Sequence, residues 1–176
     1  MALPKILFFN MLKEKIETDF KQAMKERKEI EISVLRMLRA DILNKEKEKR
    51  YNLSKEKPEL TEEELEKESS LTDEEILQVI LSKIKKSKEA ILSFEKGERE
   101  DLVKKEKEEI EVLKRYLPEQ LSEEEIKKMA REVIEEIDAK DIKDMGRVMS
   151  NLMPKIKGRA DGSLVSKIVK EMLSYD

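Results

Sequence analysis

The chain contains 176 residues, 45% of them charged, with a net charge of −3, four glycines, four prolines, and neither cysteine nor histidine. Lacking those two residue types, it cannot form disulfides, thiolate nucleophiles, imidazole-dependent triads or zinc sites built on cysteine or histidine. The glycines fit neither of the common phosphate-loop patterns, so we expect no catalytic residues, no metal and no cofactor. Abundant Glu, Lys, Leu and Ile with little Gly or Pro favours an all-α fold.

The first ten residues, MALPKILFFN, contain an apolar run from Ile6 to Phe9. That run is far too short to span a bilayer, and no cleavage site of small residues follows it. We therefore expect a cytoplasmic protein that has no membrane partner.

Apolar residues spaced by three and four positions predict about four helices in an N-terminal domain, residues 1–117. The four helices cover about 12–24, 31–49, 73–96 and 102–117. Gly97 follows the third and is expected to end it in the left-handed conformation. Residues 51–70, which include Pro58, hold at most a short helix, and we expect a mobile connector there.

Three short phrases share one helix-starting pattern: LTEEEL (60–65), LTDEEI (71–76) and LSEEEI (121–126). Each places a hydroxyl residue three positions before a glutamate, with apolar residues on both sides. This is the capping box combined with the hydrophobic staple, so each phrase predicts the start of a helix.

Residues 118–176 are expected to form a separate C-terminal domain of three helices, with Pro118 to Leu121 as the boundary. The first helix begins after Ser122. The second carries the apolar stripe Met145, Val148, Met149 and Leu152, with Asp141 as its N-cap. The last helix, capped by Asp161 or Ser163, extends to Leu173.

Glycine and proline punctuate this C-terminal region. Gly146 inside a helix should cost roughly 0.5–1 kcal/mol relative to alanine, which is easiest to understand if another backbone or a ligand approaches it. Pro154 should end or kink that helix. Gly158 and Gly162 are free to adopt positive φ in the turn that follows.

The same region is basic in an otherwise acidic chain. Between Lys140 and Lys170, eight basic residues oppose three acidic ones, a net charge of +5. Charge sorted in this way indicates a surface for an anionic partner. The lysines of KIKKSK (83–88) form a second cluster, but closely spaced acidic residues favour a solvated helix face there.

Several phrases resemble one protein family. KDMGRVM (143–149), LMPKIKGRADG (152–162) and LVSKIVK (164–170) are similar to the C-terminal signature of the YqeY-like proteins, and the likeness continues upstream in VLRMLRA (34–40), REDLV (99–103) and VLKRYLPEQLSEEEI (112–126). That family is related to the tail domain of one subunit of the aspartyl/glutamyl-tRNA amidotransferase. Because the likeness begins near Met11, either Met1 or Met11 could be the native start.

The resemblance implies tRNA binding through the tail, with an amidotransferase or another protein as a further partner. Carried over residue by residue, it implies a first group of tRNA contacts, formed by Lys155, Lys157 and Arg159. A second group follows, formed by Lys143, Arg147 and Lys167. A carbon–nitrogen ligase activity with glutamine as amide donor would be inherited by homology only. The chain lacks the catalytic cradle of the amidotransferase subunit, so we do not expect it to be catalytic alone.

Two other interpretations remain open at the level of sequence. Amphipathic helices and a charged connector also suit a protein-interaction module with no RNA function, which would dock by helix-in-groove contacts. The lysines of the turn could also serve only to keep that loop in water. Measuring tRNA binding at two salt concentrations separates these interpretations from RNA recognition.

Overall fold

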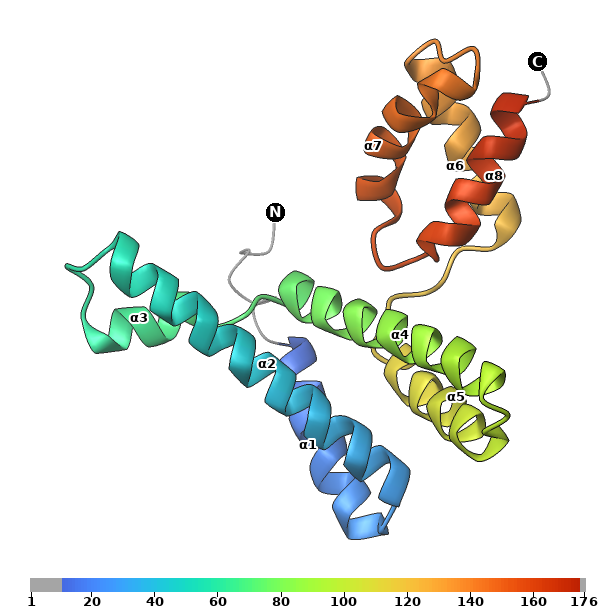
Figure 1. The fold of residues 1–176 in the computed structure, drawn as a ribbon. Coiled ribbons are helices and arrows are strands. Elements are labelled where there is room, and N and C mark those ends of the chain that lie inside the picture. The colour runs from blue at the N-terminus through green and yellow to red at the C-terminus, as the bar shows by residue number, and fades with distance from the viewer. Residues whose placement is uncertain (1–10, 175–176) are drawn as a thin grey trace, which may run out of the picture. The chain divides into compact units, whose positions relative to one another are not determined.

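The computed structural model describes residues 11–174, and within them the regular structure is helical throughout (Figure 1). The prediction of an all-α fold is confirmed. The elements follow in this order: α1 (Met11–Glu26), α2 (Glu29–Glu56), α3 (Glu62–Ser69), α4 (Asp73–Lys96), α5 (Glu100–Lys114), α6 (Glu123–Glu136), the 3-10 turn η2 (Ile142–Asp144), α7 (Met145–Ile156) and α8 (Gly162–Ser174). No helix among the described residues is both long and apolar enough to cross a membrane.

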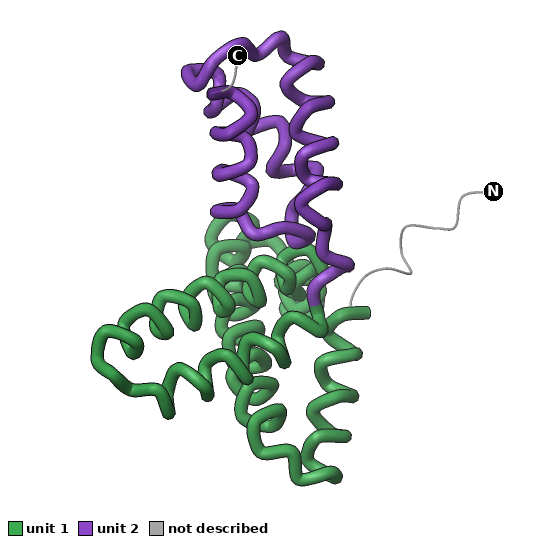
Figure 2. The backbone as a smooth tube through the Cα atoms, turned by 90° about the vertical axis from the view of Figure 1, so that its right-hand side faces the viewer, with its two compact units in different colours: residues 1–116 green, residues 117–176 purple. Residues whose placement is uncertain are grey.

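The chain divides into two compact units, residues 1–116 and 117–176, which have different colours in Figure 2. In the first unit α1 packs against α2 and α4 packs against α5, while α2 also contacts α3, α4 and α5. Most of the predicted apolar residues face these contacts, but Met24 and Leu43, which were expected to point inward, are 46% and 49% exposed. The most deeply buried apolar side chains of this unit include Ile16, Val34, Leu35, Leu38, Ile76, Ile80 and Leu113. Burial of these side chains is the main source of stability in this unit.

The second predicted helix is longer than expected, and the segment after it is more regular. Residues 51–56 continue α2, so the connection to α3 is confined to residues 57–61. The short helix predicted within residues 61–70 is α3, which buries Leu65 and Ser69 against its neighbours. Lys57 pairs with Glu68 at 2.8 Å across this hairpin. The prediction that α2 ends near residue 49 was wrong. The last turns of α2 are highly charged, and packing against α3 stabilises them.

All three capping boxes are present. The side chains of Thr61, Thr72 and Ser122 each accept a hydrogen bond from the backbone N–H three residues later. The glutamate at that third position returns the bond to the backbone N–H of the cap residue. The hydrogen bonds from Thr61 lower the pKa of Glu64, and those from Ser122 lower the pKa of Glu125.

The left-handed residue at the end of α4 is Glu98, so the prediction for Gly97 was wrong. Gly97 has φ −91°, whereas Glu98 has φ +54°. The N–H of Arg99 donates to the carbonyl of Phe94 at 3.0 Å, and the N–H of Glu98 donates to that of Glu95 at 3.2 Å. This is the Schellman motif. The helix ends at Lys96 as predicted, but Gly97 is its C-cap, so the left-handed position falls on the next residue, Glu98.

In the second unit α6, α7 and α8 surround one apolar core. It consists of residues contributed by all three helices: Ile126, Ala130, Val133, Val148, Leu152, Ile156, Val165, Ile168, Val169 and Leu173. Asp141 accepts a hydrogen bond from the N–H of Lys143 and so begins η2, which continues directly into α7. Pro154 lies inside α7, and the helix ends two residues later at Ile156, which is fully buried.

Candidate nucleic-acid interface

The first group of predicted contacts lies in the last turn of α7 and in the turn between α7 and α8, where Gly158 sets the backbone geometry. Gly158 has φ +76°, as its position in the turn predicts, and it is buried. A methyl group at this position would lie 3.6 Å from Cγ of Pro118. Gly162 does not share this conformation, because it is the first residue of α8. Positive φ is therefore required at only one of the two glycines.

The segment before α6 holds this turn in place. The N–H of Leu121 donates to the carbonyl oxygen of Arg159 at 2.7 Å. The side-chain amide of Gln120 donates to the carbonyl oxygens of Pro118 and Gly158, at 2.8 Å each. Gln120 was not predicted as a functional residue from the sequence, because the residues next to it do not indicate a hydrogen bond of this kind. Its role depends on residues about forty positions away in the chain.

Asp161 ends the turn and caps α8. Its Oδ1 accepts from the N–H of Ser163 at 2.9 Å and from that of Leu164 at 3.4 Å. Of the two predicted caps, Asp161 therefore makes these bonds and Ser163 donates one of them. A carboxylate at the first turn also interacts favourably with the helix dipole.

The three cations of the turn differ in their surroundings. The ammonium group of Lys155 lies 2.9 Å from Oε2 of Glu136, and both side chains are about half exposed or more, at 47% and 64%. Lys157 is exposed. Arg159 is partly buried, and its Nε donates to the carbonyl oxygen of Glu119 at 3.3 Å. A surface ion pair such as that of Lys155 contributes only about 0–1 kcal/mol, so this ammonium can exchange Glu136 for a phosphate.

The second group of predicted contacts does not lie together. Lys143 and Arg147 are exposed near the start of α7, and Lys167 is exposed on α8. Arg147 donates to Oδ1 of Asp144 at 2.8 Å and to the carbonyl oxygen of Ile137 at 3.1 Å. The N–H of Lys140, followed by the Arg147 side chain, lowers the pKa of Asp144.

Helix length separates the two ends of this basic region. Lys143 lies just before α7 and Lys155 lies in its last turn. At about 1.5 Å per residue, they are roughly 18 Å apart along the helix axis. The six predicted residues therefore form separate groups at the two ends of α7, with Lys167 on the neighbouring helix.

The backbone at Gly146 is open on its outer side. Among residues 11–174, no heavy atom outside its own helix would lie within 4 Å of a methyl group at this position. Of the two explanations expected for this glycine, no described backbone approaches it, and the approach of a ligand stays a prediction. The side chain of Arg147, the next residue, is 61% exposed, so this end of α7 offers an accessible surface.

One buried carboxylate lies outside this region among the described residues. Glu109 on α5 is only 6% exposed, and it was not among the residues predicted from the sequence. Its position four residues before Leu113 places both on one helix face, which was the available signal. Within residues 11–174, no group of three or more carboxylates is arranged to hold a metal ion.

Comparison with known proteins supports the resemblance carried by the phrases above. The family model described as Yqey-like protein matches residues 13–59 and 57–173. No curated protein matches the chain. Because the matched residues cover nearly the whole chain, including both ends of α7 and the turn after it, the chain belongs to the YqeY-like family.

Proposed function

We propose that this protein binds tRNA through the cations at the α7–α8 turn and acts as an accessory factor to tRNA amidation in the cytoplasm. The observation that carries the proposal is the exposure of Lys155, in the last turn of α7, and of Lys157, in the turn that follows, next to a backbone held by the segment before α6. Gly158 and Arg159 each accept a hydrogen bond from the segment before α6, at 2.8 and 2.7 Å. Side chains that start from a fixed backbone lose less freedom on binding.

The charge of the region suits a phosphate backbone. Lys143, Lys157 and Lys167 are exposed. Lys155 and Arg147 form surface ion pairs with carboxylates, and Arg147 also donates to the carbonyl oxygen of Ile137. Lysine and arginine at such positions bind phosphates without reading sequence. The sparse aromatic residues argue against recognition of single strands by base stacking. Phe20 and Tyr116 are 8% and 6% exposed, and Tyr51, which is 60% exposed, lies on α2 and not in the basic region. A folded RNA read by shape and phosphates fits these properties best.

The association with tRNA amidation rests on the family relationship to the amidotransferase tail domain. This relationship makes an amidotransferase the partner enzyme and assigns no catalytic step to this chain. The alternative of a protein-interaction module predicts that tRNA binding is absent even at low salt.

The test is a titration of total tRNA with the purified chain at two salt concentrations. The wild type should bind, and its affinity should fall steeply as salt rises because each neutralised phosphate releases counterions. Lys155→Glu with Lys157→Glu should weaken binding at least tenfold and lower the salt slope by about one per lysine removed. Arg159 is left intact because its bond to Glu119 makes it part of the turn.

The control is Lys104→Glu with Lys105→Glu, the same charge change at exposed positions on α5. This variant should bind tRNA like the wild type. If the wild type does not bind at low salt, the proposal is wrong. If Lys143→Glu with Arg147→Glu abolishes binding while the turn variant binds normally, the contact lies at the other end of α7.

A further inference from the structure

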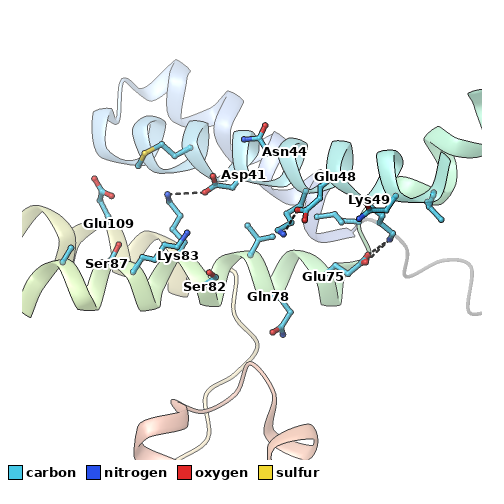
Figure 3. Close-up of a pocket in the computed structure, with 18 of the residues that line it drawn as sticks. Asp41, Asn44, Glu48, Lys49, Glu75, Gln78, Ser82, Lys83, Ser87 and Glu109 are labelled. Atoms are coloured by element: carbon cyan, nitrogen blue, oxygen red, sulfur yellow. Dashed lines mark hydrogen bonds and ion pairs between the residues drawn. The ribbon is translucent and has the colours of Figure 1, made fainter. Parts of the chain in front are cut away.

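A groove of about 1160 Å³ lies in the first unit, lined by α2, α4 and α5 (Figure 3). Ligand pockets are commonly about 300–1,000 Å³, so this groove is large enough for an extended small molecule. Its lining is mixed. Met37, Leu53, Val79 and Ala90 contribute apolar surface, and carboxylates outnumber lysines among the remaining side chains.

Two polar groups of the groove are buried without a partner. Glu109 on α5 is 6% exposed and Ser87 on α4 is 7% exposed, and both line the groove. In Figure 3 the carboxylate of Glu109 points from α5 toward α2. Within the described part of the chain, no hydrogen bond or ion pair satisfies either side chain. A buried carboxylate without a partner is costly, because it has lost water and gained nothing in exchange.

The lysines near Glu109 do not compensate for its charge. Lys83 on α4 is 3.4 Å from Oδ2 of Asp41 on α2, and Figure 3 shows it directed toward that residue. At the other end of the groove, Lys49 pairs with Glu75 at 2.9 Å. Neither lysine forms an ion pair with Glu109, so its charge is only partly offset.

The electrostatics at Glu109 agree with this geometry. Burial, followed by the neighbouring charge of Glu106, raises the pKa of Glu109, while Lys105 and Lys83 act in the opposite direction. Among the other charged residues that line the groove, Lys86 lies on α4, and Asp41 on α2 is paired with Lys83. A cation placed beside Glu109 would remove the mismatch.

We propose that this groove binds a linear aliphatic polyamine, with one ammonium group at Glu109 between α4 and α5 and the carbon chain along Met37, Val79 and Ala90. An ammonium has three N–H donors. The carboxylate of Glu109 accepts one and the hydroxyl of Ser87 accepts another. The apolar lining accommodates the methylene chain, and Glu106, one turn before Glu109 on α5, provides a further carboxylate for a second ammonium.

The test is isothermal titration calorimetry of the purified full chain with spermidine at low salt. The wild type should bind one equivalent, and Glu109→Gln should weaken binding at least tenfold. The control is Glu108→Gln, the preceding residue on α5, whose side chain is 42% exposed and lies 4.0 Å from Lys104. It makes the same charge change and should bind within twofold of the wild type.

The unfolding temperature of Glu109→Gln is measured to check that the variant is folded. It should not be lower than that of the wild type, because the substitution removes a buried unpaired charge. Equal weakening by both substitutions would mean general attraction to an acidic surface and would overturn the proposal. So would an absence of binding, or equal binding of a neutral diol of the same chain length. A lysine-containing peptide that binds through Glu109 more tightly than spermidine would overturn the assignment to a free amine.

Discussion

The backbone N–H of Leu121 donates a 2.7 Å hydrogen bond to the carbonyl oxygen of Arg159, joining the start of the second unit to the turn between α7 and α8. Gln120 adds a bond to the preceding carbonyl, that of Gly158. The basic turn is thereby anchored at two successive carbonyl oxygens. Its side chains can face solvent while its backbone keeps one conformation.

This anchoring predicts that Gly158→Ala destabilises the second unit by about 1–2 kcal/mol, the typical cost of left-handed conformation in an L-residue. The nearest contact of the new methyl group, 3.6 Å from Pro118, is ordinary, so the cost comes from φ +76° rather than from a clash. Gly146→Ala is the matched control. It lies in α7 with open space around it and should stabilise by roughly 0.5–1 kcal/mol.

Urea denaturation followed by circular dichroism measures both effects. Equal stability of Gly158→Ala and the wild type would contradict the assignment of strain to this position. If Gly146→Ala is more stable but binds tRNA less tightly, the glycine serves ligand approach at that end of α7.

At the end of α4, a substitution to glycine is expected to stabilise the protein. Glu98 has φ +54° at the position where Schellman motifs favour glycine. Glu98→Gly should therefore raise the free energy of unfolding of the first unit by about 0.5–1 kcal/mol. Glu95→Gly, three residues earlier and inside the helix, is the control and should lower it by about 1 kcal/mol. Chemical denaturation of both variants distinguishes the two positions, and a loss of stability in Glu98→Gly would contradict the motif.

Tyr116 connects the end of α5 to α1. Its hydroxyl donates to Oδ2 of Asp19 at 2.8 Å, and the side chain is 6% exposed. Tyr116→Phe should destabilise the first unit by about 1.5–3 kcal/mol, the range for hydrogen bonds to charged groups. Thermal unfolding measures the loss. Asp19→Asn gives the complementary variant, and a double-mutant cycle should show strong coupling between the two residues.

Burial, followed by the Asp19 hydrogen bond, also raises the pKa of Tyr116. In a spectrophotometric titration of the folded protein, Tyr116 should therefore ionise well above the pH at which a free tyrosine does. Ionisation at the ordinary pH would contradict the hydrogen bond.

Glu109 predicts a pH dependence of stability. Its pKa is raised in the folded chain, mainly by burial, so folded protein takes up this proton more readily than unfolded protein. The destabilisation by its charge is present above the folded-state pKa and is relieved as pH falls toward the unfolded-state pKa. Glu109→Gln should remove this part of the dependence, as measured by unfolding at several pH values. Glu108→Gln should retain it.

The affinity for spermidine should also depend on the ionisation of Glu109. As pH falls through the folded-state pKa of Glu109, the carboxylate becomes neutral and affinity should decrease. An affinity that increases on acidification would contradict a contact between the ammonium and this carboxylate.

Interactions between residues close in sequence determined many features of this fold, and these features could be predicted from the sequence. The three capping boxes at Thr61, Thr72 and Ser122 were predicted from sequence because their bonds connect residues three positions apart. The all-α class followed from composition and apolar spacing, and positive φ at Gly158 from its place in a glycine-containing turn. Each of these features depends on interactions within a few residues of the chain.

The tertiary structure decided the features that depend on distant contacts. The extension of α2 to Glu56 follows from packing by α3, and the open surface at Gly146 follows from the absence of a neighbouring described element within 4 Å. The bonds that hold the basic turn join residues far apart in sequence, as do the packed helices that bury Glu109. Capping and turn conformation are short-range properties, whereas burial and the grouping of charges depend on which helices pack together.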